Sequence, residues 1–205
     1  MDLRSHSFCR SLKQKNICHV KGYLLRLRNQ TSCQMVLTAS VIAWKEISKM
    51  FSYRFKDIVL EISEDVVSHF SQHRQFGDRT EAGGELFATY PIYREKVRID
   101  FASGPHPLDQ RQKSSIHFNK VSQDEERLLR SKEGLVPVGL WHTHDECMPK
   151  LSPIDKKTGR LYANNVAAVS PVYFMIIVSN QYELDLSCWV LSRGLFRRMF
   201  RETED

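Results

Sequence analysis

The stretch GLWHTH, residues 139–144, decides how the fold is interpreted and contains the first candidate site residues. It ends an apolar, partly β-branched run that begins at Val136, and such a run predicts a strand. Residues i and i+2 of a strand project from the same face, so His142 and His144 would point the same way. Two imidazoles on one face can bind one metal ion, and the sequence therefore predicts a metal site at the end of this strand.

The stretch SPID, residues 152–155, follows the second histidine after seven residues and would complete the site. Asp155 would give a carboxylate oxygen as third ligand, which leaves one tetrahedral position open for water, the pattern of catalytic zinc. The same tetrapeptide also reads as a helix N-terminus, with Ser152 as N-cap, Pro153 at the first position and an acid at the third. Both interpretations can hold together, because a first-turn acid can still face a metal.

This spacing resembles the signature of the JAB/MPN (JAMM) metallopeptidases, which are deubiquitinase-type zinc enzymes. Their signature has a further glutamate upstream, and Glu81 matches it within TEAGGELF, residues 80–87. Glu85 is a nearby alternative, but it falls where the family has a buried apolar residue, and Glu81 is favoured. The resemblance covers about residues 55–192 and implies a Zn²⁺ ion and a three-layer αβα domain of the cytidine-deaminase-like type.

A narrower resemblance points to one bacterial branch of this family. It is carried by Gly104-Pro105, Arg111, Phe118, the expected helix end SKEG at residues 131–134 and the segment from Gly139 to His144. Members of the branch occur with ubiquitin-like conjugation genes, in mobile elements and in anti-phage operons built around nucleotidyltransferases that make cyclic oligonucleotide signals. Asp145 stands where the branch usually has proline. It could accept a hydrogen bond from a ligand imidazole or be solvated.

The resemblance implies a zinc-dependent peptidase or isopeptidase that cleaves after the C-terminus of a ubiquitin-like modifier. Glu81 would take a proton from the attacking water and pass it to the leaving amine, and Ser152 would stabilise the oxyanion. Either deconjugation from a target lysine or processing of a precursor suits this chemistry. The expected partners are a ubiquitin-like protein or its conjugate and companion conjugation enzymes.

Three other interpretations stay open at this point. The first is a zinc amidohydrolase that acts on a sulfur-carrier protein or a small molecule through the same site. The second is a non-catalytic MPN interaction module, which would typically have lost ligands. The third is nucleic-acid binding through a basic arm, which is the least favoured. Cys147 is expected to be an ordinary loop cysteine, and His69 with His73 a solvated helix edge rather than a second metal pair.

Composition and charge divide the chain. The chain of 205 residues has a net charge of +6. Residues 1–49 hold nine Lys and Arg against two acids, which gives +7, and the remaining residues together give −1. We therefore expect residues 1–50 to be a basic, poorly ordered extension, with a helix over 36–47 at most, and residues 51–205 to be the metallopeptidase domain. Five cysteines without a Cys-x-x-Cys pair indicate a reducing cytoplasm. No apolar run is long enough for a membrane helix, so no membrane partner is expected.

Strand and helix patterns alternate along the rest of the chain, which predicts an α/β fold around a mixed sheet. Ser122 is expected to cap a helix over 123–131, with Leu128 and Leu129 facing inward and Gly134 ending it. Ser63 is expected to cap the helix that runs to residue 73. The predicted strands cover residues 57–62, 86–92, 96–102, 115–119, 136–141, 172–178 and 184–191, and residues 195–200 form a short amphipathic end.

Overall fold

The structure, a computed structural model, describes residues 51–181 and 184–202. The predicted extension over residues 1–50, with its helix over 36–47, lies outside these residues. Within the described part of the chain, no helix is long and apolar enough to cross a membrane.

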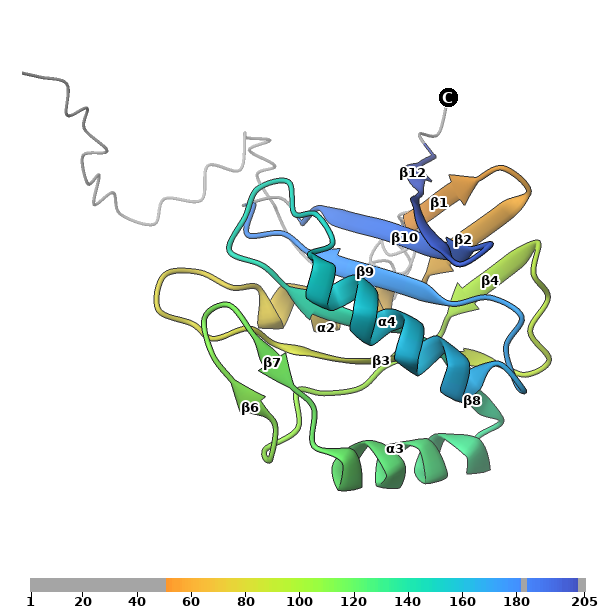
Figure 1. Cartoon of the computed structure of the whole chain (residues 1–205), viewed down its shortest axis with the longest axis horizontal. Coiled ribbons are helices and arrows are strands. Elements are labelled where there is room, and N and C mark those ends of the chain that lie inside the picture. The colour runs from red at the N-terminus through yellow and green to blue at the C-terminus, as the bar shows by residue number, and fades with distance from the viewer. Residues whose placement is uncertain (1–50, 182–183, 203–205) are drawn as a thin grey trace, which may run out of the picture. The chain divides into compact units, whose positions relative to one another are not determined.

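A mixed six-stranded sheet forms the centre of this domain (Figure 1). Its middle pair, β8 and β9, is parallel, and its other neighbours are antiparallel. The strand order across the sheet is β11 (Leu195–Arg198), β10 (Leu186–Ser192), β9 (Phe174–Val178), β8 (Leu135–Thr143), β3 (Gly83–Thr89) and β5 (Phe101–Ala102).

The described residues also form two smaller sheets and three helices. The four-stranded sheet has the order β12 (Phe200–Arg201), β1 (Phe51–Phe55), β2 (Ile58–Ile62) and β4 (Lys96–Ile99), and the short hairpin pairs β6 (Gln110–Arg111) with β7 (Ile116–His117). The helices are α2 (Glu64–His73), α3 (Lys120–Lys132) and α4 (Pro153–Val166).

Both faces of the central sheet are buried, which makes the fold three layers thick. On one face, α2 and the four-stranded sheet form an apolar core that includes Leu60, Phe70 and Trp141. On the other face, α4 packs through Ala163 onto a second core that includes Leu140. Figure 1 shows α4 crossing one face while α2 lies behind the sheet. The predicted three-layer α/β fold is therefore confirmed.

A β-bulge in β8 decides which side chains of this strand face α4. Leu86 pairs with Gly139 and Phe87 pairs with Pro137, so Val138 is the extra residue. Val138 consequently lies in the same core as Trp141, although a regular strand would place two residues three apart on opposite faces. After the bulge, Leu140 faces the α4 layer.

The sequence interpretation of α3 was wrong in two respects. The helix starts at Lys120, with Asn119 as its N-cap, because the Asn119 side chain accepts a hydrogen bond from the Ser122 backbone N–H. Leu128 and Leu129 are 61% and 46% exposed and do not face inward. The one fully buried position of this helix is polar, so its apolar residues do not mark its inner face. Ser63 does occupy the N-cap position of α2, as predicted, but its side chain makes no capping hydrogen bond.

Several strand boundaries also differ from the prediction. The strand expected over 86–92 begins at Gly83 and ends at Thr89. The strand expected over 115–119 is limited to Ile116–His117, paired with β6. The C-terminal amphipathic segment forms two strands instead: β11 pairs with β10 after a tight turn, and β12 pairs with β1 in the four-stranded sheet.

Candidate metal centre

Pairing between β3 and β8 positions both histidines and the upstream glutamate. The antiparallel pairing places Gly83 opposite His142, and Ala82 and Thr143 then exchange hydrogen bonds just beyond the end of β3. A Cβ on residue 83 would lie 2.7 Å from the Trp141 carbonyl oxygen, so only glycine lets the strands approach this closely here. Glu81 is thereby placed directly beside the end of β8.

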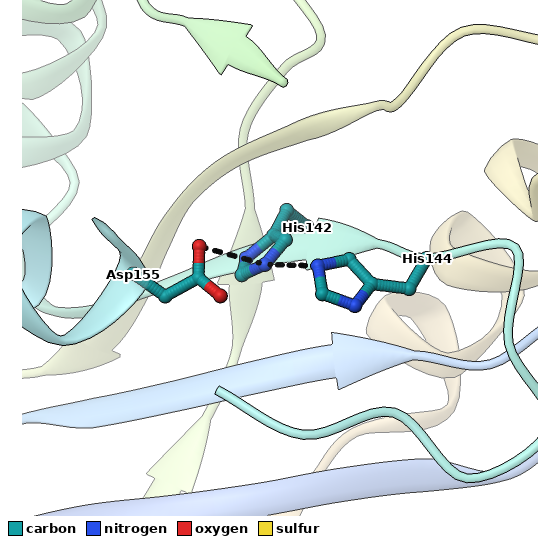
Figure 2. A group of neighbouring side chains, drawn as sticks. All are labelled: His142, His144 and Asp155. Carbon is teal, nitrogen blue, oxygen red and sulfur yellow. Dashed lines mark hydrogen bonds and ion pairs between the residues drawn. The ribbon is translucent and has the colours of Figure 1, made fainter. Parts of the chain in front are cut away.

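The side chains of His142, His144 and Asp155 converge (Figure 2). Their ligand atoms all lie within 4.8 Å of one another. The two Nε2 atoms are 3.1 Å apart, and the Nε2 of His142 is 3.5 Å from Oδ1 of Asp155. Tetrahedral zinc ligands at about 2.1 Å are roughly 3.4 Å from each other. The donor set therefore fits a tetrahedral ion with one position open.

The first turn of α4 holds Asp155 through a capping box. Oδ2 of Asp155 accepts a hydrogen bond of 2.7 Å from the Ser152 N–H, and Oγ of Ser152 accepts one of 3.1 Å from the Asp155 N–H. This arrangement leaves Oδ1 free to face His142. The Ser152 hydroxyl hydrogen makes no hydrogen bond to any described residue, so it remains available as a donor in the same cavity.

Local electrostatics lower the pKa values of two of the three candidate ligands, Asp155 and His144. Burial by itself would raise the pKa of Asp155, but the hydrogen bond and charge of His142, with the Ser152 hydrogen bonds, outweigh it and lower this pKa to about 2. Burial, followed by the neighbouring His142, lowers the pKa of His144. An ionised carboxylate beside a neutral imidazole is the ligand state that metal binding requires.

Glu81 has the position and the acidity of a general base. Its Oε1 lies 3.9 Å from Nε2 of His144, and the residue is 6% exposed. Burial raises the pKa of Glu81 to about 7, to which the carboxylates of Asp155 and Glu146 contribute and which His142 opposes. A carboxyl group with this pKa can both accept and release a proton near neutral pH.

Glu85 is committed to an ion pair away from these ligands. Arg127 of α3 donates to both of its carboxylate oxygens, at 2.9 Å from Nε to Oε2 and 2.6 Å from Nη2 to Oε1. Glu85 is only 1% exposed, and it pairs in register with Leu140 on the face that α3 and α4 cover. Glu85 is thus bound in a buried ion pair with Arg127, and Glu81 is the glutamate beside the histidines.

The β6–β7 hairpin holds the backbone of Glu81 from both sides, which the sequence alone did not indicate. The Arg111 guanidinium donates to the Glu81 carbonyl oxygen, and the Glu81 N–H donates to the Gln112 carbonyl at 2.8 Å. Gln75, 1% exposed, donates in turn to the Lys113 carbonyl at 2.7 Å. In the sequence, Arg111 stands out only through the family resemblance. Its hydrogen bond to the Glu81 carbonyl oxygen gives it a positioning role for the Glu81 backbone.

A cavity of about 400 Å³ opens over the candidate metal centre. All five predicted site residues line it: Glu81, His142, His144, Ser152 and Asp155. Its other walls come from the hairpin side and from α4, and several are apolar: Ile116, Phe118, Leu140, Ile154 and Met175. The arrangement can hold an extended, partly apolar chain next to a cation, a base and a hydroxyl donor.

The neighbours of His144 differ from the sequence interpretation. Asp145 does not contact a ligand imidazole, because its Oδ1 accepts a 2.7 Å hydrogen bond from the Asn180 amide. The acidic side chain near this imidazole is that of Glu146, with Oε2 at 3.9 Å from Nδ1 of His144. Cys147 is an exposed free cysteine, in keeping with an ordinary loop position.

The second histidine pair belongs to the other face of the sheet. His69 and His73 contact each other with ring centroids 4.7 Å apart, and His69 contacts Trp141 at 5.2 Å. Both are half-buried against this core residue, so the prediction of a solvated helix edge was wrong. Trp141 lies in the core opposite the α4 layer, so this pair is separated from His142 by the sheet. Among the described residues, the grouped potential metal ligands are His142, His144 and Asp155.

Comparison with known proteins finds similarity to solved structures but not to family models or curated proteins. No protein-family model matches the chain, and no curated protein does. A protein from Desulfitobacterium hafniense, solved in solution, is similar at 18% sequence identity with a TM-score of 0.45, over 67% of this chain and 87% of the other.

Proposed function

We propose that this chain is a zinc-dependent peptidase of the JAB/MPN type that hydrolyses the amide bond after the C-terminus of a ubiquitin-like modifier. The observation that carries the proposal is the convergence of His142, His144 and Asp155 with a buried carboxyl group of raised pKa, Glu81. Two imidazoles, one carboxylate and an open position are the pattern of catalytic zinc sites. The motif spacing quoted above supports the family, and through it the substrate class.

The chain's own residues supply the remaining chemistry. A zinc ion in this site would activate water near neutral pH and polarise the scissile carbonyl. Glu81 accepts the proton of the attacking water and delivers it to the leaving amine. The Ser152 hydroxyl, whose hydrogen has no partner among the described residues, donates to the oxygen that becomes negative. Since water is the nucleophile, no acyl-enzyme forms.

The cavity supports a substrate with a narrow, extended tail. Its apolar walls, Ile116 and Phe118 on the hairpin side and Ile154 on α4, flank the route to the histidines. A flexible C-terminal tail of a small folded modifier would fit this route, with either a target lysine or further residues beyond the bond. We place the reaction in the cytoplasm, with companion conjugation enzymes, on the cysteine usage and the resemblance.

The test combines metal content with cleavage. Purified protein is expected to hold one zinc per chain by mass spectrometry of the metal, and to cleave ubiquitin-like fusions or isopeptide-linked conjugates until a chelator is added. Glu81→Gln should keep zinc and lose at least about 100-fold in rate, since acid–base catalysis contributes ~10²–10⁴-fold. His144→Ala should lose zinc.

His73→Ala is the matched control, because His73 lies on the other face of the sheet and should keep both zinc and activity. Wild-type cleavage by a folded Glu81→Gln protein would contradict the proposal. Cleavage of small amides alone, with no modifier fusion processed, would assign the site to an amidohydrolase instead.

A further inference from the structure

A second cavity, of about 610 Å³, lies where two tight turns meet. The β1–β2 turn contributes Lys56 and Asp57, the β10–β11 turn contributes Arg193, and Arg94 and Arg197 close the sides. None of its lining residues lines the cavity over the candidate metal centre. It carries four cationic side chains against one carboxylate.

The arginines of this cavity are unlike the others in the described part of the chain. Most described arginines are engaged: Arg127 and Arg130 pair with acids, and Arg160 donates to a carbonyl. Within residues 51–181 and 184–202, three arginines have no side-chain hydrogen bond, ion pair or ring contact, and all three line this cavity: Arg94, Arg193 and Arg197.

Convergence of unpaired cations has an energetic consequence. Each guanidinium has five donors in a planar fork and stays charged, so three of them around one hollow repel one another. All three residues are exposed, so dissolved salt screens part of this repulsion. The domain that carries them is close to neutral, since the excess positive charge of the chain lies in residues 1–49. The cationic character is therefore local to this cavity, and a bound anion would relieve the repulsion.

The backbone supplies an independent observation. Lys56 and Arg193 have φ values of 56° and 50°, and they are the non-glycine residues with positive φ in the described part of the chain. This left-handed conformation disfavours residues with a Cβ by roughly 1–2 kcal/mol, and glycine or asparagine suits such turns better. Both turns nevertheless place a cationic side chain at the strained position, and both side chains line the cavity.

We propose that this cavity binds a small anion with two or more adjacent phosphates, either inorganic or linked to a nucleoside. Arginine forks match phosphate oxygens in pairs, and three guanidiniums with one ammonium exceed what a single phosphate uses. The ring of Phe55 is half-buried in the cavity wall, with the Lys56 ammonium 5.7 Å from its centroid. A nucleobase can stack on this ring once that ammonium turns toward the phosphates. Asp57 is the acceptor beside it that a ribose hydroxyl can donate to.

The experiment measures binding of inorganic triphosphate, ATP and orthophosphate to the full-length zinc-loaded protein by calorimetry at 0.15 M salt. Saturable binding of triphosphate, at least tenfold tighter than orthophosphate, is expected. Equal affinity for ATP and triphosphate would identify the phosphate chain as the whole ligand, while tighter ATP binding would add the stacking wall of Phe55; both outcomes support the site.

The variants Lys56→Asn and Arg193→Asn remove charge while giving each turn a residue that tolerates positive φ, so the fold is spared. Each should weaken triphosphate binding about tenfold, whereas Lys132→Gln, an exposed lysine at the end of α3, should not. Unchanged binding in the Lys56→Asn/Arg193→Asn double variant would overturn the proposal. So would an equal loss in Lys132→Gln, equal orthophosphate affinity, or no binding at this salt.

Discussion

At the scale of single residues, Ser152 serves two purposes with one hydroxyl group. Its oxygen accepts from the Asp155 N–H and so caps α4, while its hydrogen stays available within the candidate site. The helix cap and the proposed oxyanion donor are therefore separable in principle, because one uses a lone pair of the oxygen and the other uses its proton.

Replacing Ser152 by alanine or glycine separates the two roles. Alanine at an N-cap costs about 1 kcal/mol in helix stability, whereas glycine costs only a few tenths. Both remove the hydroxyl, and loss of an oxyanion donor lowers kcat by about 10²–10³. We expect equal losses of kcat in Ser152→Ala and Ser152→Gly, but a clear fall in melting temperature for alanine alone. Retained activity in the glycine variant would leave Ser152 with the cap only.

At the scale of secondary-structure elements, the Glu85–Arg127 pair fastens α3 to β3. Both carboxylate oxygens are bound, and the Arg127 side chain is 25% exposed while that of Glu85 is 2% exposed. The pair explains why an acid occupies a position where an apolar residue was expected. It also explains how α3 packs with its leucines outward, since its attachment is polar.

Breaking this pair from one side should destabilise the protein more than removing it entirely. Arg127→Leu leaves a buried carboxylate without a partner, which costs about 3–5 kcal/mol. The double variant Glu85→Leu/Arg127→Leu removes that charge and should recover most of the loss. Urea denaturation of the wild type and both variants measures the difference. A single-variant loss below about 1 kcal/mol would show that the pair does not fasten these elements.

At the scale of the whole molecule, Glu81 links stability to pH in the metal-free protein. Its pKa is raised from 4.5 to about 7 in the folded state, chiefly by burial. Between these values the folded state binds more protons than the unfolded state, so the free energy of unfolding falls as pH rises through this window. The lowered pKa of His144 acts in the opposite direction near pH 6.5, because the unfolded state then binds the extra proton.

The contribution of Glu81 is isolated by comparison with Glu81→Gln, which cannot ionise. The variant should gain stability over the metal-free wild type as pH rises from 4.5 to 7, by on the order of 3 kcal/mol at most, since one pKa unit equals about 1.4 kcal/mol. Above this window the gap should stay constant. Thermal melts of chelator-treated protein from pH 5 to 8 test this, and a gap that does not vary with pH would contradict the assigned pKa.

Much of the site was predictable because its residues act through short spacings. The His-x-His pattern needs only the alternation of a strand, and Ser-Pro-x-Asp needs only the first turn of a helix. Arg111 and Arg127 were not predictable as partners of Glu81 and Glu85, because each pairing joins elements far apart in the chain. The inward face of α3 was not predictable for the same reason.

The amino-acid sequence by itself determined the types of the candidate ligands, the alternating elements and the α/β class, because these depend on local periodicity and on the chemistry of single side chains. Only the tertiary structure decided that a bulge at Val138 sets which side chains of β8 face α4. It alone placed Glu81, and not Glu85, beside the histidines, and it alone brought three unpaired arginines to one cavity. Such facts depend on how strands shift and pair across the chain, which no local pattern specifies.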